Sequence, residues 1–147
     1  MASATMLDTA LAAEAAFYRA FELGDPEAMM SVWADLPEVR CIHPLGTLLT
    51  GPAAIRASWV ELFRAQLPRR FEIERVNVVR AGDLAVHTVY ETISLPLQRQ
   101  RFPPLLATNV YRESRGEWRM VLHHASPVGA VEAAPSFDLN ESNATRH

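Results

Sequence analysis

The chain has 147 residues and a formal charge of −3 at pH 7, and arginine supplies all 14 of its basic residues. This length suits a single domain with one packed core. The acidic balance argues against nucleic-acid binding, which requires clustered basic side chains, and the lack of lysine excludes a Schiff-base mechanism on this chain. Cys41 is the only cysteine, so no intrachain disulfide can form, which is typical of an intracellular protein.

The N-terminal segment lacks the features of an export signal. Residues 1–17 contain no basic side chain, and Asp8 and Glu14 interrupt their apolar run. We therefore expect neither a signal peptide nor a membrane span, no membrane partner, and a cytoplasmic protein.

The first half of the sequence has the apolar spacing of helices. Gly24 is a natural helix stop, and Asp25 directly before Pro26 is a typical start for the next helix. An apolar stripe after Gly51 indicates another helix. The three predicted helices cover residues 7–23, residues 26 to about 35–37, and residues 52–68.

The second half changes to the alternation that is typical of strands. Two short β-favouring segments, residues 39–43 and 47–50, are expected to pair with each other. Three prolines between residues 96 and 104 predict a loop or an irregular edge. The four longer predicted strands cover residues 71–80, 84–95, 105–112 and 118–126.

Helices followed by hairpin-linked strands indicate an α+β fold, in which helices cover one face of a sheet. We expect a single domain over residues 1–128. Residues 129–147 are polar and irregular in pattern, so we expect a flexible C-terminal tail there.

Several short motifs occur in the order typical of the nuclear transport factor 2-like superfamily, and the SnoaL-like branch is the most similar. The chain resembles these proteins over roughly residues 7–128. The motifs are Gly24-Asp25-Pro26-Glu27-Ala28, Trp33, His43-Pro44-Leu45-Gly46, Gly51-Pro52-Ala53-Ala54-Ile55, and the closing runs 108–112 and 118–127.

This resemblance implies a cystatin-like cone: a curved antiparallel or mixed sheet, with three helices from the first half packed on its concave face around a deep pocket. Members commonly form homodimers through the sheet. They include ketosteroid isomerase, polyketide cyclases, dehydratases, epoxide hydrolases and non-enzymatic binding domains. Because one fold supports so many activities, the resemblance leaves the function open.

His43 resembles in position the carboxylate base of ketosteroid isomerase. A histidine can take up or release a proton near neutral pH, so His43 is a candidate catalytic residue. The alternative is that its ring only makes a hydrogen bond in the pocket wall.

Asn109 resembles in position the protonated aspartic acid of that isomerase's oxyanion hole. Its amide could donate a hydrogen bond to developing negative charge, which makes it a second candidate; the alternative is a structural strand asparagine. Phe17 occupies the place of the isomerase's tyrosine and has no proton to donate. Tyr18 is adjacent, but we expect it to face another direction on the helix.

His123 and His124 are neighbours on a predicted strand, so their side chains should point to opposite faces and cannot bind one metal ion together. His124 shares its parity with Trp118 and Met120, and we therefore predict that His124 faces the pocket as a third catalytic candidate. No metal site is predicted.

Aromatic side chains could line an apolar ligand cavity, although large aromatic residues at these spacings also form cores. We favour the core for Trp33. The candidate ligand-binding residues are Phe17, Tyr18, Trp33, Trp59 and Phe63.

Two further residues are given structural roles. Cys41 has the same parity as His43, but a buried single cysteine usually packs rather than reacts. Glu91 lies on a strand, where a glutamate usually faces solvent or an interface.

The sequence leaves three functions open. The first is a cofactor-independent enzyme that acts on a small apolar carbonyl or epoxide compound, with His43 moving a proton and Asn109 steadying the charge. The second is a domain that binds an apolar ligand without turnover. The third is a structural homodimer. No cofactor is implied, because the chain has no glycine-rich phosphate loop.

Overall fold

The computed structural model describes residues 6–129. The predicted tail, apart from Gly129, lies outside these residues. In chain order the elements are α1 (Ala10–Leu23), α2 (Pro26–Val32), β1 (Arg40–Ile42), β2 (Leu49–Thr50), α3 (Pro52–Phe63), β3 (Arg70–Ala81), β4 (Leu84–Leu95), the 3₁₀ turn η1 (Pro96–Gln98), β5 (Gln100–Arg101), β6 (Leu105–Ser114) and β7 (Glu117–Pro127). None of the described helices is long and apolar enough to cross a membrane.

Capping residues set both ends of α1 and the start of α2. The Thr9 hydroxyl accepts a hydrogen bond of 2.9 Å from the Ala12 amide, and Asp25 caps α2 in the same way. Between them, Gly24 adopts φ 64°, a left-handed conformation that favours glycine at a helix C-terminus.

Helix α2 is shorter than predicted. It ends at Val32, because Trp33 takes an extended conformation and forms a parallel bridge with Met120 of β7. The Ala34 amide then donates to the Met120 carbonyl at 2.9 Å. Pairing with the sheet therefore overrides the local helical pattern that had predicted a helix through residues 35–37.

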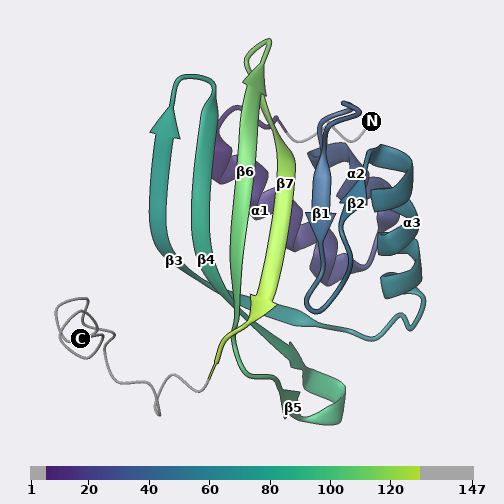
Figure 1. The fold of residues 1–147 in the computed structure, drawn as a ribbon. Coiled ribbons are helices and arrows are strands. Elements are labelled where there is room, and N and C mark those ends of the chain that lie inside the picture. The colour runs from purple at the N-terminus through teal and green to yellow at the C-terminus, as the bar shows by residue number, and fades with distance from the viewer. Residues whose placement is uncertain (1–5, 130–147) are drawn as a thin grey trace, which may run out of the picture.

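The strands form one curved, mixed sheet in the order β2-β1-β7-β6-β4-β3, with β5 paired to the end of β4. All neighbours are antiparallel except β1 and β7, which run parallel. Figure 1 shows α1 lying across one face of the sheet, while α2 and α3 stand beside β1 and β2. The predicted α+β architecture is confirmed; the predicted homodimer through the sheet stays a prediction.

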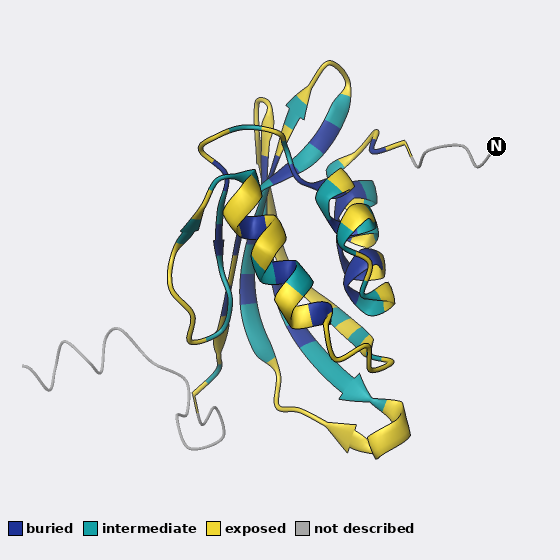
Figure 2. Ribbon diagram, turned by 90° about the vertical axis from the view of Figure 1, so that its right-hand side faces the viewer, coloured by how far each residue is buried: buried dark blue, intermediate teal, exposed yellow. Residues whose placement is uncertain are grey.

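The core lies between this sheet and the helices. Aromatic rings of α1 and α3 pack edge-to-face, as with Phe17 and Trp59 at 5.7 Å between ring centroids. Figure 2 shows the buried positions of α3 and the exposed η1–β5 segment. That segment, within the proline-rich region predicted as a loop or irregular edge, contains only a single 3₁₀ turn and a two-residue strand.

A bulge in β7 reverses the parity of the strand. Met120 pairs with Tyr111, but Leu122 pairs with Val110, so Val121 is an extra residue in the ladder. The prediction that His124 faces inward is therefore wrong. His123 is buried and His124 is exposed.

Candidate functional site

A cavity of about 320 Å³ opens at the end of the core, between α3, the segment that follows it, and the sheet. Most of its lining is apolar. Its ionisable side chains are His43, Arg69, Glu91 and His123, and its remaining lining residues are Phe21, Pro44, Leu62, Ala65, Leu67, Ile93, Leu95, Leu105 and Ala125. A largely apolar cavity with a few converging polar groups is the usual form of a small-molecule site.

Glu91 is a cavity residue that the sequence analysis assigned wrongly to solvent or an interface. It is only 1% exposed. The alternation of β4 places Glu91 on the inner face together with Ala85 and Val89. The sequence could have indicated this position, because Glu91 has the same parity as these buried residues of β4. That parity outweighs the general preference of glutamate for the surface.

The surroundings of Glu91 favour its neutral form. Burial raises the pKa of its carboxyl group to about 7, although the hydrogen bond from Tyr18 acts in the opposite direction. Among the described residues, no arginine or histidine forms an ion pair with Glu91. The carboxyl group therefore exchanges a proton close to neutral pH.

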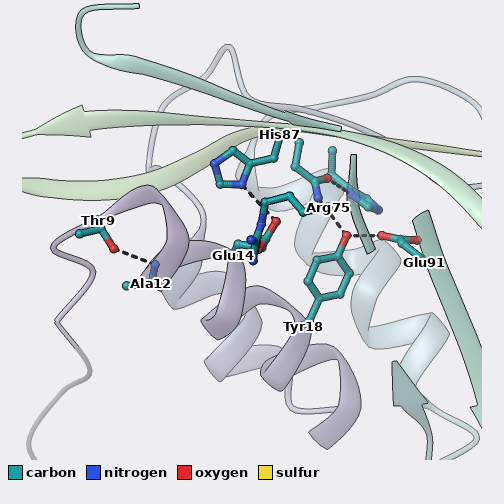
Figure 3. Close-up of polar contacts among 9 residues, drawn as sticks. Thr9, Ala12, Glu14, Tyr18, Arg75, His87 and Glu91 are labelled. Carbon is teal, nitrogen blue, oxygen red and sulfur yellow. Dashed lines mark hydrogen bonds and ion pairs between the residues drawn. The ribbon is translucent and has the colours of Figure 1, made fainter. Parts of the chain in front are cut away.

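Tyr18 joins Glu91 to the rest of the site. Its hydroxyl donates to Oε2 of Glu91, as Figure 3 shows, and accepts a hydrogen bond of 2.9 Å from Nδ2 of Asn109. Tyr18 thus faces the interior. Phe17 and Tyr18 are both buried, because α1 lies deep enough against the sheet for adjacent positions to be covered.

Asn109 continues the same chain of hydrogen bonds. Since its amide nitrogen donates to Tyr18, its Oδ1 is the acceptor for Nδ1 of His123, at 2.6 Å. The structure therefore brings Asn109 and His123 together, whereas His124 lies on the opposite face. Asn109 is buried behind the cavity wall, where it holds Tyr18 and His123 in place.

His123 is a neutral hydrogen-bond acceptor at the cavity. Burial, aided by the nearby His43 and His124, lowers the pKa of His123 to about 3. Because Nδ1 carries the proton toward Asn109, Nε2 keeps its lone pair. The ring can thus accept a hydrogen bond from a ligand.

His43 lines the cavity beside His123, and the centroids of the two rings lie 6.4 Å apart. Ser58 donates to the Ile55 carbonyl, so its oxygen is the acceptor for Nε2–H of His43 at 2.9 Å. This leaves Nδ1 of His43 as the basic atom. Burial lowers the pKa of His43.

Cys41 does not form a reactive pair with His43. Its sulfur lies 3.7 Å from Nε2 of His43, but burial first, and then the nearby Glu91, raise the pKa of the Cys41 thiol to about 12. The thiol therefore stays protonated and packs in the core, as the sequence analysis favoured.

The predicted ligand-binding aromatic residues are buried, and none of them lines the cavity. Four lie directly behind its wall: the ring centroids are 4.9 Å apart for Phe17 and His123, and 4.7 Å for His43 and Trp59. Tyr18 bonds Glu91, and Phe63 lies under Arg69. Trp33 lines a separate surface groove, on the side of α2. Within residues 6–129, no three His, Cys, Asp or Glu side chains are placed to hold a metal ion.

A second polar group lies under α1, one turn before Tyr18. Glu14 accepts hydrogen bonds from Nδ1 of His87 at 3.1 Å and from Nη2 of Arg75 at 2.8 Å (Figure 3). Burial alone would raise the pKa of Glu14, but the hydrogen bonds from His87 and Arg75 outweigh it and lower the pKa. None of these three residues lines the cavity.

The fold and the cavity define a small α+β pocket protein of the nuclear transport factor 2-like superfamily. A family model for the SnoaL-like domain matches residues 11–130. The chain therefore belongs to the SnoaL-like domain family, which confirms the resemblance inferred from the sequence motifs.

Two solved structures are similar in both sequence and fold. One, from Thiobacillus denitrificans, carries the provisional description of a calcium/calmodulin-dependent protein kinase type II association domain; it is 44% identical, with a TM-score of 0.77 over 82% of this chain and 95% of that one. The other, from Streptomyces avermitilis, is provisionally a dehydratase of the NTF2-like family; it is 32% identical, with a TM-score of 0.73 over 84% of this chain and 96% of that one.

A curated relative and a more distant structure complete the comparison. The F-box protein SKIP8 of Arabidopsis thaliana is 30% identical over 100 residues, which are 68% of this chain and 41% of that protein. This chain thus matches less than half of that relative's length. A domain of unknown function from Nostoc punctiforme, 19% identical with a TM-score of 0.69 over 92% of this chain and 88% of that one, shares the cystatin-like fold.

Proposed function

We propose that this protein is a cofactor-independent enzyme that binds a small apolar carbonyl or epoxide compound and moves a proton with Glu91. The observation that carries the proposal is the carboxyl group of Glu91, buried in the wall of an apolar cavity and held by a tyrosine hydroxyl. A general base works best when its pKa lies near the working pH, and burial brings the pKa of Glu91 to about 7. The provisional dehydratase from Streptomyces avermitilis offers support from a related chain.

The chemistry follows from the donors and acceptors around the cavity. The carboxylate of Glu91 takes a proton from the carbon next to a carbonyl, leaving an enolate. It returns the proton to another carbon, which completes an isomerisation, or to a β-hydroxyl group whose C–O bond breaks to release water, which completes a dehydration. With an epoxide, Glu91 takes a proton from water as the water oxygen bonds to a ring carbon and that carbon's bond to the epoxide oxygen breaks. The proton then passes to the epoxide oxygen and a diol forms. Tyr18 stays protonated throughout, because burial and the nearby Glu91 raise its pKa well above the ordinary value, and so it can bond either form of Glu91.

The remaining polar residues have distinct roles in this proposal. His123 and Nδ1 of His43 accept hydrogen bonds, so they can orient the attacking water or a hydroxyl group of the substrate. Asn109 is a positioning residue, since both ends of its amide are occupied by Tyr18 and His123. This moves the main proton transfer from His43, as expected from the sequence, to Glu91.

The test is proton exchange in heavy water. We expect the wild-type chain to exchange the α-protons of 4-phenyl-2-butanone for deuterium, which proton NMR would measure. Alternatively, we expect it to hydrolyse styrene oxide, which chromatography would measure. Glu91→Gln keeps the shape and should slow the reaction by about 10²–10⁴-fold, the usual contribution of a general base. Glu74→Gln, on the exposed side of β3, is the matched control and should have wild-type activity.

Two outcomes would contradict the proposal. Activity that survives Glu91→Gln would remove Glu91 from the reaction. Binding of these compounds without exchange or hydrolysis would favour the alternative, a ligand-binding domain without turnover; the lack of a hydroxyl at Phe17 agrees with that alternative.

A further inference from the structure

Arg69 brings a guanidinium group into the wall of the cavity. It directly precedes β3 and shares the lining with His43, Glu91 and His123. Two contacts hold it there: Nε donates to the Leu67 carbonyl at 3.3 Å, and the guanidinium carbon lies 5.2 Å from the centre of the Phe63 ring. The group is therefore fixed in position before any ligand arrives.

One end of this guanidinium has no acceptor. Nη1 of Arg69 is enclosed by protein and has no hydrogen-bond partner among the described residues. A buried donor without a partner costs free energy, and a charged donor costs more. Seven of the twelve other arginines within residues 6–129 pair with a carboxylate instead: Arg19, Arg56, Arg64, Arg75, Arg101, Arg112 and Arg119.

The cavity itself does not supply the missing acceptor. Glu91 is its only carboxyl-bearing lining residue, and no ion pair joins Glu91 to Arg69 within the part of the chain that the structure describes. His43 and His123 are held as neutral rings by burial, which lowers the pKa of both. The cavity thus has one fixed positive charge and a mostly apolar surface.

We propose that Arg69 is an anion-binding subsite of the cavity and that the ligand is a monocarboxylate with an apolar body. A carboxylate matches the planar guanidinium, which can donate two parallel hydrogen bonds to it. A single cation balances a single negative charge, which favours a carboxylate over a phosphate. The assignment of the other end of the ligand, with its reactive carbon facing Glu91, rests on the proposed function.

Binding can be measured without any turnover. Isothermal titration calorimetry would compare phenylacetate with its neutral analogue phenylacetamide on the wild-type chain, Arg69→Gln and Arg70→Gln. We expect the wild type to prefer the carboxylate on the order of ten- to hundredfold, the range for hydrogen bonds to charged groups. Arg69→Gln should lose this preference. Arg70→Gln, which changes the exposed neighbouring arginine, should keep it.

Arg69→Lys is a second variant that keeps the positive charge and removes the planar guanidinium. It tests the subsite even if Arg69→Gln does not fold. We expect it to retain part of the preference, with circular dichroism showing that the variants are folded. A wild-type chain that binds the two probes equally, or binds neither, would overturn the subsite. A preference unchanged in folded Arg69→Gln would overturn it as well.

The same experiments separate this subsite from the proposed function. A carboxylate preference that depends on Arg69 in a chain without turnover would support the subsite and overturn the enzyme. Turnover that depends on Glu91, together with a carboxylate preference that Arg69→Gln does not change, would support the enzyme and overturn the subsite.

Discussion

Two polar groups lie under the same helix, and their carboxyl groups behave in opposite ways. Glu14 and Tyr18 are one turn apart on α1, and each reaches a residue of β4: Glu14 contacts His87, and Tyr18 contacts Glu91. Burial disfavours the charged form of both carboxyl groups. The pKa of Glu14 is nevertheless lowered, while the pKa of Glu91 is raised to about 7.

The difference shows that neighbours, as well as depth, decide the protonation of a buried acid. Glu14 has Arg75 and His87 as partners, so its charge is balanced within the fold. Glu91 has only a neutral hydroxyl as its hydrogen-bond partner and lines a mostly apolar cavity. The first group therefore suits a structural role, whereas the second leaves a carboxyl group free to exchange a proton with a ligand.

The largest effect on stability should come from Glu14→Gln. Its side chain is 5% exposed, and glutamine leaves one acceptor oxygen without a negative charge, so His87 and Arg75 can no longer both keep their partner. A buried charged group that loses a hydrogen-bond partner costs about 3 kcal/mol or more, which urea denaturation would measure. Turnover in the folded fraction should be retained. A loss below 1 kcal/mol, or a specific loss of turnover, would remove the distinction between the two groups.

The next effect is a pH-dependent difference between the wild type and Glu91→Gln. The folded pKa of about 7 lies above the ordinary value of 4.5, so the folded state binds more protons between these two values. The contribution of Glu91 to stability is therefore present at low pH and is lost as the pH rises through about 7.

The glutamine variant lacks this titration. Relative to Glu91→Gln, the wild type should lose up to about 3 kcal/mol of unfolding free energy between acid and alkaline pH. Urea denaturation of both chains at about pH 5 and about pH 9 would measure the difference. A constant difference would show that the carboxyl group of Glu91 titrates at its ordinary value.

The smallest effect should come from Arg75→Gln, which removes the outer partner of Glu14. The side chain of Arg75 is 43% exposed, so solvent screens its ion pair. We expect a loss of about 1 kcal/mol or less, because His87 and the buried carboxylate remain. A loss as large as that of Glu14→Gln would show that Arg75, rather than the pair as a whole, keeps the charge of Glu14 buried.

Local patterns predicted most of the fold, because helices and long strands carry their period in the sequence. The predicted strand over residues 84–95 matches β4, and the caps at Gly24 and Asp25 lie where the pattern placed them. The departures come from tertiary pairing. Trp33 leaves the helix to bridge with β7, which no local signal announces.

The site was harder to predict than the fold, because it depends on which way single residues face. His43 lies at the cavity as expected. Asn109 is buried behind the cavity wall, where it is hydrogen-bonded to Tyr18 and His123. The sequence could have indicated Glu91 by its parity with Val89. It could not indicate the bulge at Val121, which exists only in the register between two strands.

The bulge at Val121 also explains why two consecutive histidines matter at this point of the chain. The backbone decides which of the two is enclosed, and in this register it is His123. A shift of β7 by one residue in the appropriate direction would bring the imidazole of His124 inward in place of that of His123. The tandem pair thus keeps an imidazole at this wall position after a one-residue deletion earlier in β7, whereas a one-residue insertion there would bring Leu122 to it.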